Sequence, residues 1–144
     1  MKITMPDCDL SVMAWEVMDV QALIIDNNHD DCARLVANLR RGGYETVAVA
    51  TASQAREALA SRTFDLLLLE LKLPDGDGLQ LCNEIRERLG DQMVIIFVSN
   101  KKSAVSRVVG IELGADDFMD KPCDEDELLA RIEVRMRRRG QVMS

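Results

Sequence analysis

Four polar residues, each at the end of a short apolar run, are the strongest candidates for chemistry in this sequence. They are Asp26, Glu70, Ser99 and Lys121. Carboxylate oxygens are the ligands that hard cations such as Mg²⁺ prefer, and a lysine ammonium group neutralises carboxylates that lie beside it. These side chains can act together only if the fold brings positions from most of the chain to one place.

The alternation of apolar runs with helical patterns predicts how they meet. We expect strands over residues 20–25, 45–50, 65–69, 94–98 and 117–120, and helices over residues 30–41, 53–61, 79–89, 103–113 and 124–139. This order is typical of an α/β fold, a doubly wound parallel sheet of five strands with helices on both faces. Sites in such sheets form at the carboxyl ends of the strands. The last strand is the least apolar, so we expect it at an edge.

Local patterns predict the ends and buried faces of the helices. Ser53 is the expected N-cap of the second helix. Gly114 should end the fourth helix, and acids at residues 124–127 should begin the last helix at its positive end. The expected buried stripes are Leu81, Ile85 and Leu89 in the third helix, and Leu128, Leu129, Ile132 and Met136 in the last.

Length and composition limit the range of functions. A chain of 144 residues is expected to form one domain, here residues 20–139, with an extension at 1–19 and a tail at 140–144 that reads as the start of a linker. The extension carries Val12, Trp15, Val17 and Met18. Two interpretations are open, a short amphipathic turn or an extension that docks loosely or not at all. The net charge of −7 argues against binding to nucleic acid by this domain.

Other classes of site are disfavoured as well. Four scattered cysteines without a C-x-x-C pair, together with a single histidine, argue against structural zinc. No run approaches the ~20 apolar residues that a membrane span needs, and no signal peptide is recognisable. We expect a cytoplasmic protein that makes no contact with a membrane.

The four strand ends, together with the pair Lys121-Pro122, resemble the receiver domain of response regulators in two-component signal transduction, over roughly residues 20–139. The resemblance implies a flavodoxin-like (βα)5 fold with strand order 2-1-3-4-5, and a place in a phosphorelay. It also implies that Ser99, Phe118 and Lys121 are the switch residues, and that the Lys121-Pro122 peptide is cis.

The same resemblance assigns a metal site and a phosphoacceptor. Mg²⁺ would be held by Asp26, Asn27, Glu70 and the backbone carbonyl of Lys72. Asn27 stands where the family has a second acid, so we expect this Mg²⁺ site to be weak or lost and expect no other cofactor. Glu70 stands where the family has the aspartate that accepts the phosphoryl group.

Glutamate at position 70 changes the chemistry. Its side chain is one methylene longer, a reach of about 1.5 Å, and misplacement by about 1 Å can cost on the order of 100-fold in rate. We hypothesise that the Glu70 carboxylate lies near the phosphoryl position, pairs with Lys121 and accepts a hydrogen bond from Ser99. That arrangement would favour an active-like state without phosphate. A solvated acid on a silent scaffold and residual phosphorylation remain the alternatives.

The last turn and helix resemble the OmpR/PhoB class, in which two copies associate through the fourth helix, fifth strand and fifth helix. The resemblance implies interchain ion pairs of Arg107 with Glu127 and of Asp117 with Arg131. It also places Asp116 opposite Glu133, which would be repulsive.

The predicted function is therefore that of an atypical, phosphorylation-independent receiver rather than an enzyme. We expect a homodimer that controls a transcriptional output through a DNA-binding domain beyond this chain. The alternative is a stand-alone adaptor that binds another protein through the same face. A phosphohydrolase with Asp26 as nucleophile would need an aspartate two residues later, and residue 28 is asparagine.

Overall fold

The computed structural model describes residues 20–100 and 104–139. The extension at 1–19, the tail at 140–144 and the predicted helix start at residue 103 lie outside the described residues. The elements are β1 (Gln21–Ile25), α2 (His29–Arg41), β2 (Glu45–Val49), α3 (Ala52–Ser61), β3 (Leu66–Leu69), β4 (Lys72–Leu73), β5 (Gly76–Asp77), α4 (Gly78–Leu89), β6 (Val94–Ser99), α5 (Ala104–Glu112), β7 (Asp117–Asp120) and α6 (Glu125–Arg138).

Five parallel strands form one sheet in the order β2-β1-β3-β6-β7. Counted along the five strands of the sheet, this is the predicted order 2-1-3-4-5, and the fold is flavodoxin-like. The prediction that the last strand lies at an edge is confirmed, since β7 pairs only with β6 in the sheet. The β4–β5 hairpin is a separate two-stranded pair that follows β3.

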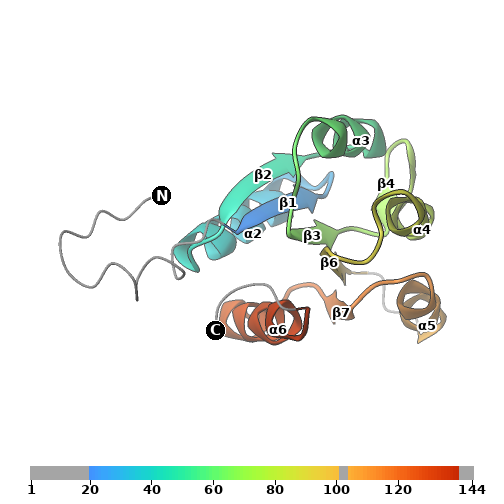
Figure 1. Cartoon of the computed structure of the whole chain (residues 1–144). Coiled ribbons are helices and arrows are strands. Elements are labelled where there is room, and N and C mark those ends of the chain that lie inside the picture. The colour runs from blue at the N-terminus through green and yellow to red at the C-terminus, as the bar shows by residue number, and fades with distance from the viewer. Residues whose placement is uncertain (1–19, 101–103, 140–144) are drawn as a thin grey trace.

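The sheet separates two aliphatic cores, with helices on both sides (Figure 1). Successive residues of each inner strand point to opposite faces, which is why these strands are apolar at every position. Leu67 and Leu69 lie on the side of α3 and α4, where Phe97 is fully buried. Leu66 and Leu68 lie on the side of α2 and α6.

The start of α3 differs from the prediction. Thr51, not Ser53, is the N-cap, and its side chain accepts the N–H of Gln54 at 3.0 Å. Asp75, far away in the sequence, accepts the N–H groups of Ala52 at 2.8 Å and Ser53 at 2.9 Å. These hydrogen bonds lower the pKa of Asp75 below its usual value. The second cap comes from the β4–β5 turn, so no local pattern could reveal it.

One of the expected core positions is wrong, and a second is confirmed only in part. Leu89 is 46% exposed, because α4 ends there and Gly90 follows with a positive φ of 80°. Leu129 is only partly buried against the core on its side of the sheet. The remaining stripe residues Leu81, Ile85, Leu128, Ile132 and Met136 are buried as predicted.

Gly78, the first residue of α4, is required by the close approach of this helix to the end of β3. A Cβ at Gly78 would overlap the carbonyl oxygen of Glu70 and lie 3.0 Å from the Cα of Leu71. Gly78→Ala should therefore destabilise the domain by on the order of 1–3 kcal/mol, measured by urea unfolding. Gly76→Ala is the control, since its Cβ would lie 3.7 Å from that of Ala52. Equal stabilities of the two variants would contradict this packing.

Candidate functional site

The fold brings the four predicted residues to one edge of the sheet. Asp26 follows β1, Glu70 follows β3, Ser99 ends β6 and Lys121 follows β7. These strands are neighbours in the sheet, so their carboxyl ends converge. All four residues are buried, with relative exposures between 0% and 8%. Burial of this many polar groups is costly unless they bind one another.

Lys121 is the centre of this cluster. Its Nζ atom donates to Asp26 Oδ2 at 2.7 Å, to Glu70 Oε1 at 2.7 Å and to Asp31 Oδ2 at 3.1 Å. An ammonium group has three donors, so these carboxylates satisfy all of them. We refer to Lys121, Asp26, Asp31 and Glu70 as the lysine cluster.

Asp31 was missed by the sequence analysis. It lies in the first turn of α2, where an acid is also expected simply because it complements the helix dipole. Its side chain is 23% exposed, compared with 2% for Asp26. The contact of Asp31 with Lys121 could not be predicted from the sequence, because it depends on how α2 lies beside the end of β7.

Backbone groups fix two of the carboxylates in place. Glu70 Oε2 accepts the N–H of Leu71 at 2.7 Å, and Asp26 Oδ1 accepts the N–H of Asn28 at 2.9 Å. The Asn28 side chain in turn caps α2 by accepting the N–H of Asp31 at 2.9 Å. Asn28 therefore acts as a helix cap at the position where a phosphohydrolase would need its second aspartate.

The charges of the cluster depend on one another. Burial acts to lower the pKa of Lys121, but the hydrogen bonds to Asp26, Glu70 and Asp31 outweigh it and raise this pKa. Burial raises the pKa of Asp26, while the hydrogen bonds from Lys121 and Asn28 act against that rise. The raised pKa of Lys121 means that its stabilisation is complete below the ordinary lysine pKa of about 10.4 and is lost only above the folded value. Lys121 is therefore a permanent cation at neutral pH.

A polar pocket of about 180 Å³ opens beside the cluster. Asn27, Lys72, Ser99 and Asn100 line it together with Asn28 and the cluster residues Asp31, Glu70 and Lys121. The predicted contact between Glu70 and Lys121 is present, whereas a hydrogen bond from Ser99 to Glu70 stays a prediction.

The predicted Mg²⁺ ligands are oxygen donors, but two of them are already engaged by a cation of the protein. Of the four predicted ligands, Asp26 and Glu70 each hold the Lys121 ammonium at 2.7 Å, and Asn27 offers a neutral amide. Within residues 20–100 and 104–139, no three His, Cys, Asp or Glu side chains are grouped to share a metal ion. A divalent cation would therefore share Asp26 and Glu70 with the Lys121 ammonium group.

The predicted aromatic switch residue points inward. Phe118 is 5% exposed, and its ring centroid lies 5.8 Å from that of Phe97. The guanidinium of Arg107 lies 5.0 Å from the Phe118 ring centroid and pairs with Asp120 at 2.5 Å. The cis peptide expected between Lys121 and Pro122 is present.

Several of the predicted interface residues are paired within this chain. Arg131 binds Asp117 at 3.0 Å and Glu127 at 2.9 Å, and Arg135 binds Asp117 at 3.3 Å. In the predicted dimer, Asp117, Glu127 and Arg131 would therefore exchange partners within the chain for partners in the second copy.

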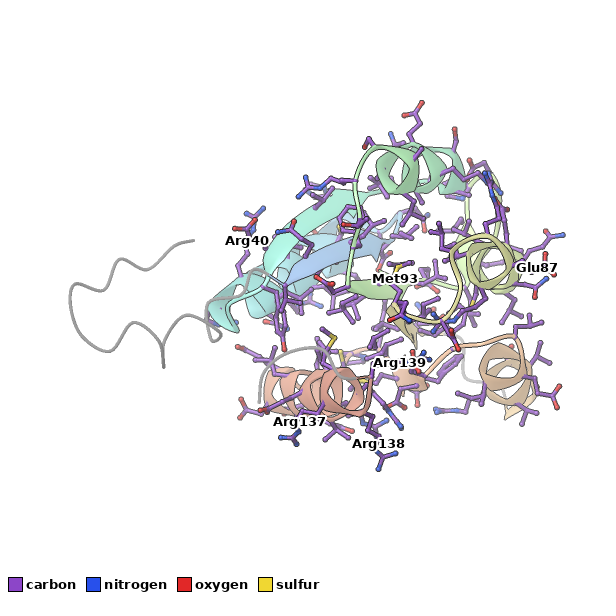
Figure 2. The ribbon with its side chains drawn as sticks, in the orientation of Figure 1. Arg40, Glu87, Met93, Arg137, Arg138 and Arg139 are labelled. Carbon is purple, nitrogen blue, oxygen red and sulfur yellow. The ribbon has the colours of Figure 1, made fainter. Side chains whose placement is uncertain are left out.

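Asp116 is held inside the chain. Its carboxylate accepts from Arg86 at 2.9 Å, from Arg139 at 2.5 Å and from the N–H of Ile95 at 2.8 Å. Figure 2 shows Arg137 and Arg138 pointing away from α6, while Arg139 lies nearer the middle of the domain. Because two arginines neutralise Asp116, the expected repulsion with the exposed Glu133 is weakened.

Comparison with known proteins places this geometry in a family. A family model for the response regulator receiver domain matches residues 22–133. A two-component response regulator from Clostridium difficile is similar at 28% identity and a TM-score of 0.80, covering 85% of this chain and 100% of its own. A CheY-like receiver domain protein from Methanospirillum hungatei is similar at 26% identity and a TM-score of 0.80, over 85% of this chain and 97% of its own.

A third solved structure is the receiver domain of TorR, a response regulator of the TMAO respiratory system. It is 33% identical, with a TM-score of 0.76, over 83% of this chain and 98% of its own. Among the helices that the structure describes, none is both long and apolar enough to cross a bilayer.

The lysine cluster predicts a characteristic pattern of stabilities. Lys121→Met should cost about 3–5 kcal/mol, because Asp26 and Glu70 would be left buried without their cation. The double variant Lys121→Met/Glu70→Gln should cost less than the sum of the two single variants, since the second change removes one unpaired charge. Urea unfolding of the four proteins in this cycle measures the difference.

Asp31→Asn is the matched control for this cycle. Its carboxylate is partly exposed and makes the longest of the three contacts, so its loss should cost about 1 kcal/mol or less. Strict additivity in the cycle, or a larger cost for Asp31→Asn than for Lys121→Met, would contradict the arrangement.

Proposed function

Because this chain belongs to the response regulator receiver domain family, we propose that it is an atypical receiver in which the lysine cluster takes over the role of phosphorylation. The observation that carries the proposal is the position of the Lys121 ammonium, 2.7 Å from both Asp26 and Glu70. Glu70 holds this lysine at the place where the family keeps its phosphoacceptor. The contact between the acid at position 70 and the switch lysine is therefore present without phosphorylation.

The chemistry of the site disfavours transfer of a phosphoryl group to Glu70. Phosphoryl transfer depends on placement of the acceptor and on cations that neutralise the developing charge. The Glu70 carboxylate is engaged by Lys121 and by the N–H of Leu71. A Mg²⁺ ion would find a neutral amide at Asn27 and would share Asp26 and Glu70 with Lys121, which supports a weak metal site. The buried position of Phe118 supports an active-like conformation that is present without phosphate.

We assign the chain to an OmpR/PhoB-like class that dimerises through α5, β7 and α6. This face carries three large apolar side chains that are well exposed, Val108 at 57%, Ile111 at 48% and Val134 at 37%. The same three elements carry charged residues that the class uses for interchain pairs, namely Arg107, Asp117, Glu127 and Arg131. An apolar centre with a charged rim is the usual anatomy of an interface.

The dimer would control a transcriptional output through a DNA-binding domain outside this chain, since the acidic receiver is unsuited to DNA itself. The second candidate is a stand-alone adaptor. It is favoured by the same apolar patch, because a different protein would cover Val108, Ile111 and Val134 equally well.

Sedimentation of the unmodified protein tests the proposal, without Mg²⁺ or a phosphodonor. We expect a concentration-dependent dimer that dissociates more readily in Glu70→Ala, because the lysine then loses its link to the phosphoacceptor position.

Ile111→Glu should weaken the dimer directly, because Ile111 lies on the proposed face. Leu89→Glu is the control, since Leu89 has a similar exposure on α4, outside the proposed face. A monomer at every concentration would favour the adaptor, and an unaffected dimer in Glu70→Ala would leave Glu70 without a signalling role.

Restoration of the family's acids should bring phosphorylation back. The double variant Asn27→Asp/Glu70→Asp regains the acid at position 27 and the shorter acceptor at position 70, so incubation with acetyl phosphate and Mg²⁺ should give a phosphorylated protein by intact mass. The wild type should stay unmodified under the same conditions. Phosphorylation of the wild-type chain at Glu70 would contradict the proposed independence from phosphate.

A further inference from the structure

A small apolar groove lies between the C-terminal halves of α3 and α4, away from the proposed dimer face. It is lined by Arg56, Leu59, Ala60, Ile85, Arg88 and Leu89. Glu84 joins the two helices across it by an ion pair with Arg56 at 2.9 Å. Leu89 is one of the four large apolar side chains that are exposed in the described part of the chain.

The groove is smaller than a cavity that encloses benzene, so it can take only part of a large apolar side chain. Its volume is about 110 Å³. An engineered apolar cavity of about 150 Å³ holds a benzene molecule. An indole or thioether that enters from the open side would bury part of its surface and cover Leu89 at the same time.

β1, the first strand of the sheet, begins near one end of this groove. The N–H of Gln21, the first residue of β1, donates to Asp65 Oδ2 at 2.9 Å. Arg62, the C-cap of α3, donates to Gln21 Oε1 at 2.5 Å. Leu59 and Ala60 belong to the last turn of the same helix. The segment before Gln21 therefore begins next to the helix end that forms one wall of the groove.

The preceding segment has the reach and the chemistry to fill the groove. Trp15 is six positions before Gln21, so an extended chain can carry it up to roughly 20 Å, about two helix diameters. Val12, Trp15 and Met18 recur at a spacing of three residues. Such a spacing puts apolar side chains on one side of a single turn.

The charges of segment and groove are of opposite sign. Residues 1–19 contain one lysine and four acids, which gives a formal side-chain charge of −3. The groove contributes Arg56 and Arg88 against Glu84, and Arg62 lies at its end. Exposed ion pairs add little affinity, so their effect is mainly on orientation.

We propose that residues 12–18 dock in the α3–α4 groove, with the indole of Trp15 as the anchor beside Leu89. The docked segment covers a surface that is separate from the α5–β7–α6 face. It leaves that face available for a second copy or another protein. The inference does not depend on the proposed function, because it involves neither the lysine cluster nor phosphorylation.

Trp15 is the only tryptophan in the chain, so its fluorescence reports on docking directly. In the folded 144-residue chain we expect an emission maximum at shorter wavelength, and weaker quenching by acrylamide, than in the same chain unfolded in urea. Leu89→Glu should shift the emission to longer wavelength and raise the quenching towards the unfolded value. Arg88→Glu should cause a smaller change in the same direction.

Ile111→Glu is the matched control, because Ile111 is 48% exposed on α5 and Leu89 is 46% exposed on α4. It should leave the emission unchanged, while thermal unfolding shows that both variants are folded. A wild-type Trp15 that is quenched as strongly as in urea would overturn the proposal. A shift caused by Ile111→Glu but not by Leu89→Glu, or a shift that depends on protein concentration, would overturn it too, since Trp15 would then contact the other face or a second copy.

Discussion

The contact of one lysine ammonium with three carboxylates is the interaction on which the arrangement of this domain depends. Lys121 draws together the ends of β1, β3 and β7 and the first turn of α2, through Asp26, Glu70 and Asp31. Each group would be costly to bury alone, and together they satisfy one another. The cluster therefore closes the carboxyl edge of the sheet, and under the proposed function it also takes over the role of phosphorylation.

β7 connects the lysine cluster to the proposed dimer face on α5, β7 and α6. Lys121 directly follows β7. Two residues of this strand contact Arg107 of α5: the Phe118 ring packs against its guanidinium, and Asp120 forms an ion pair with it. At the opposite end of the same strand, Asp116 ties β6, α4 and the end of α6 together. Contacts therefore run from Glu70 through Lys121 to β7, and from β7 through Asp120 to Arg107 of α5.

Much of the fold could be predicted because strong patterns fix it. The apolar runs of the inner strands and the alternation with helices predict the sheet, and the family resemblance predicts its order. The positions of Asp26, Glu70, Ser99 and Lys121 follow from that order alone. Features set by contacts between distant segments could not be predicted. Asp75 caps α3 from a hairpin, Asp31 joins the cluster from a helix, and Arg86 and Arg139 neutralise Asp116 from two other helices.

The central claim is that Lys121 is the resident cation of this site, and calorimetric titration with Mg²⁺ tests it most directly. The wild-type protein should give no saturable heat, because Asp26 and Glu70 are held by the lysine. Lys121→Ala removes the ammonium group from the two predicted carboxylate ligands, Asp26 and Glu70, and should gain Mg²⁺ affinity if it remains folded by circular dichroism. Saturable binding by the wild type that equals or exceeds that of Lys121→Ala would contradict the account, since the lysine would then not stand in for the metal.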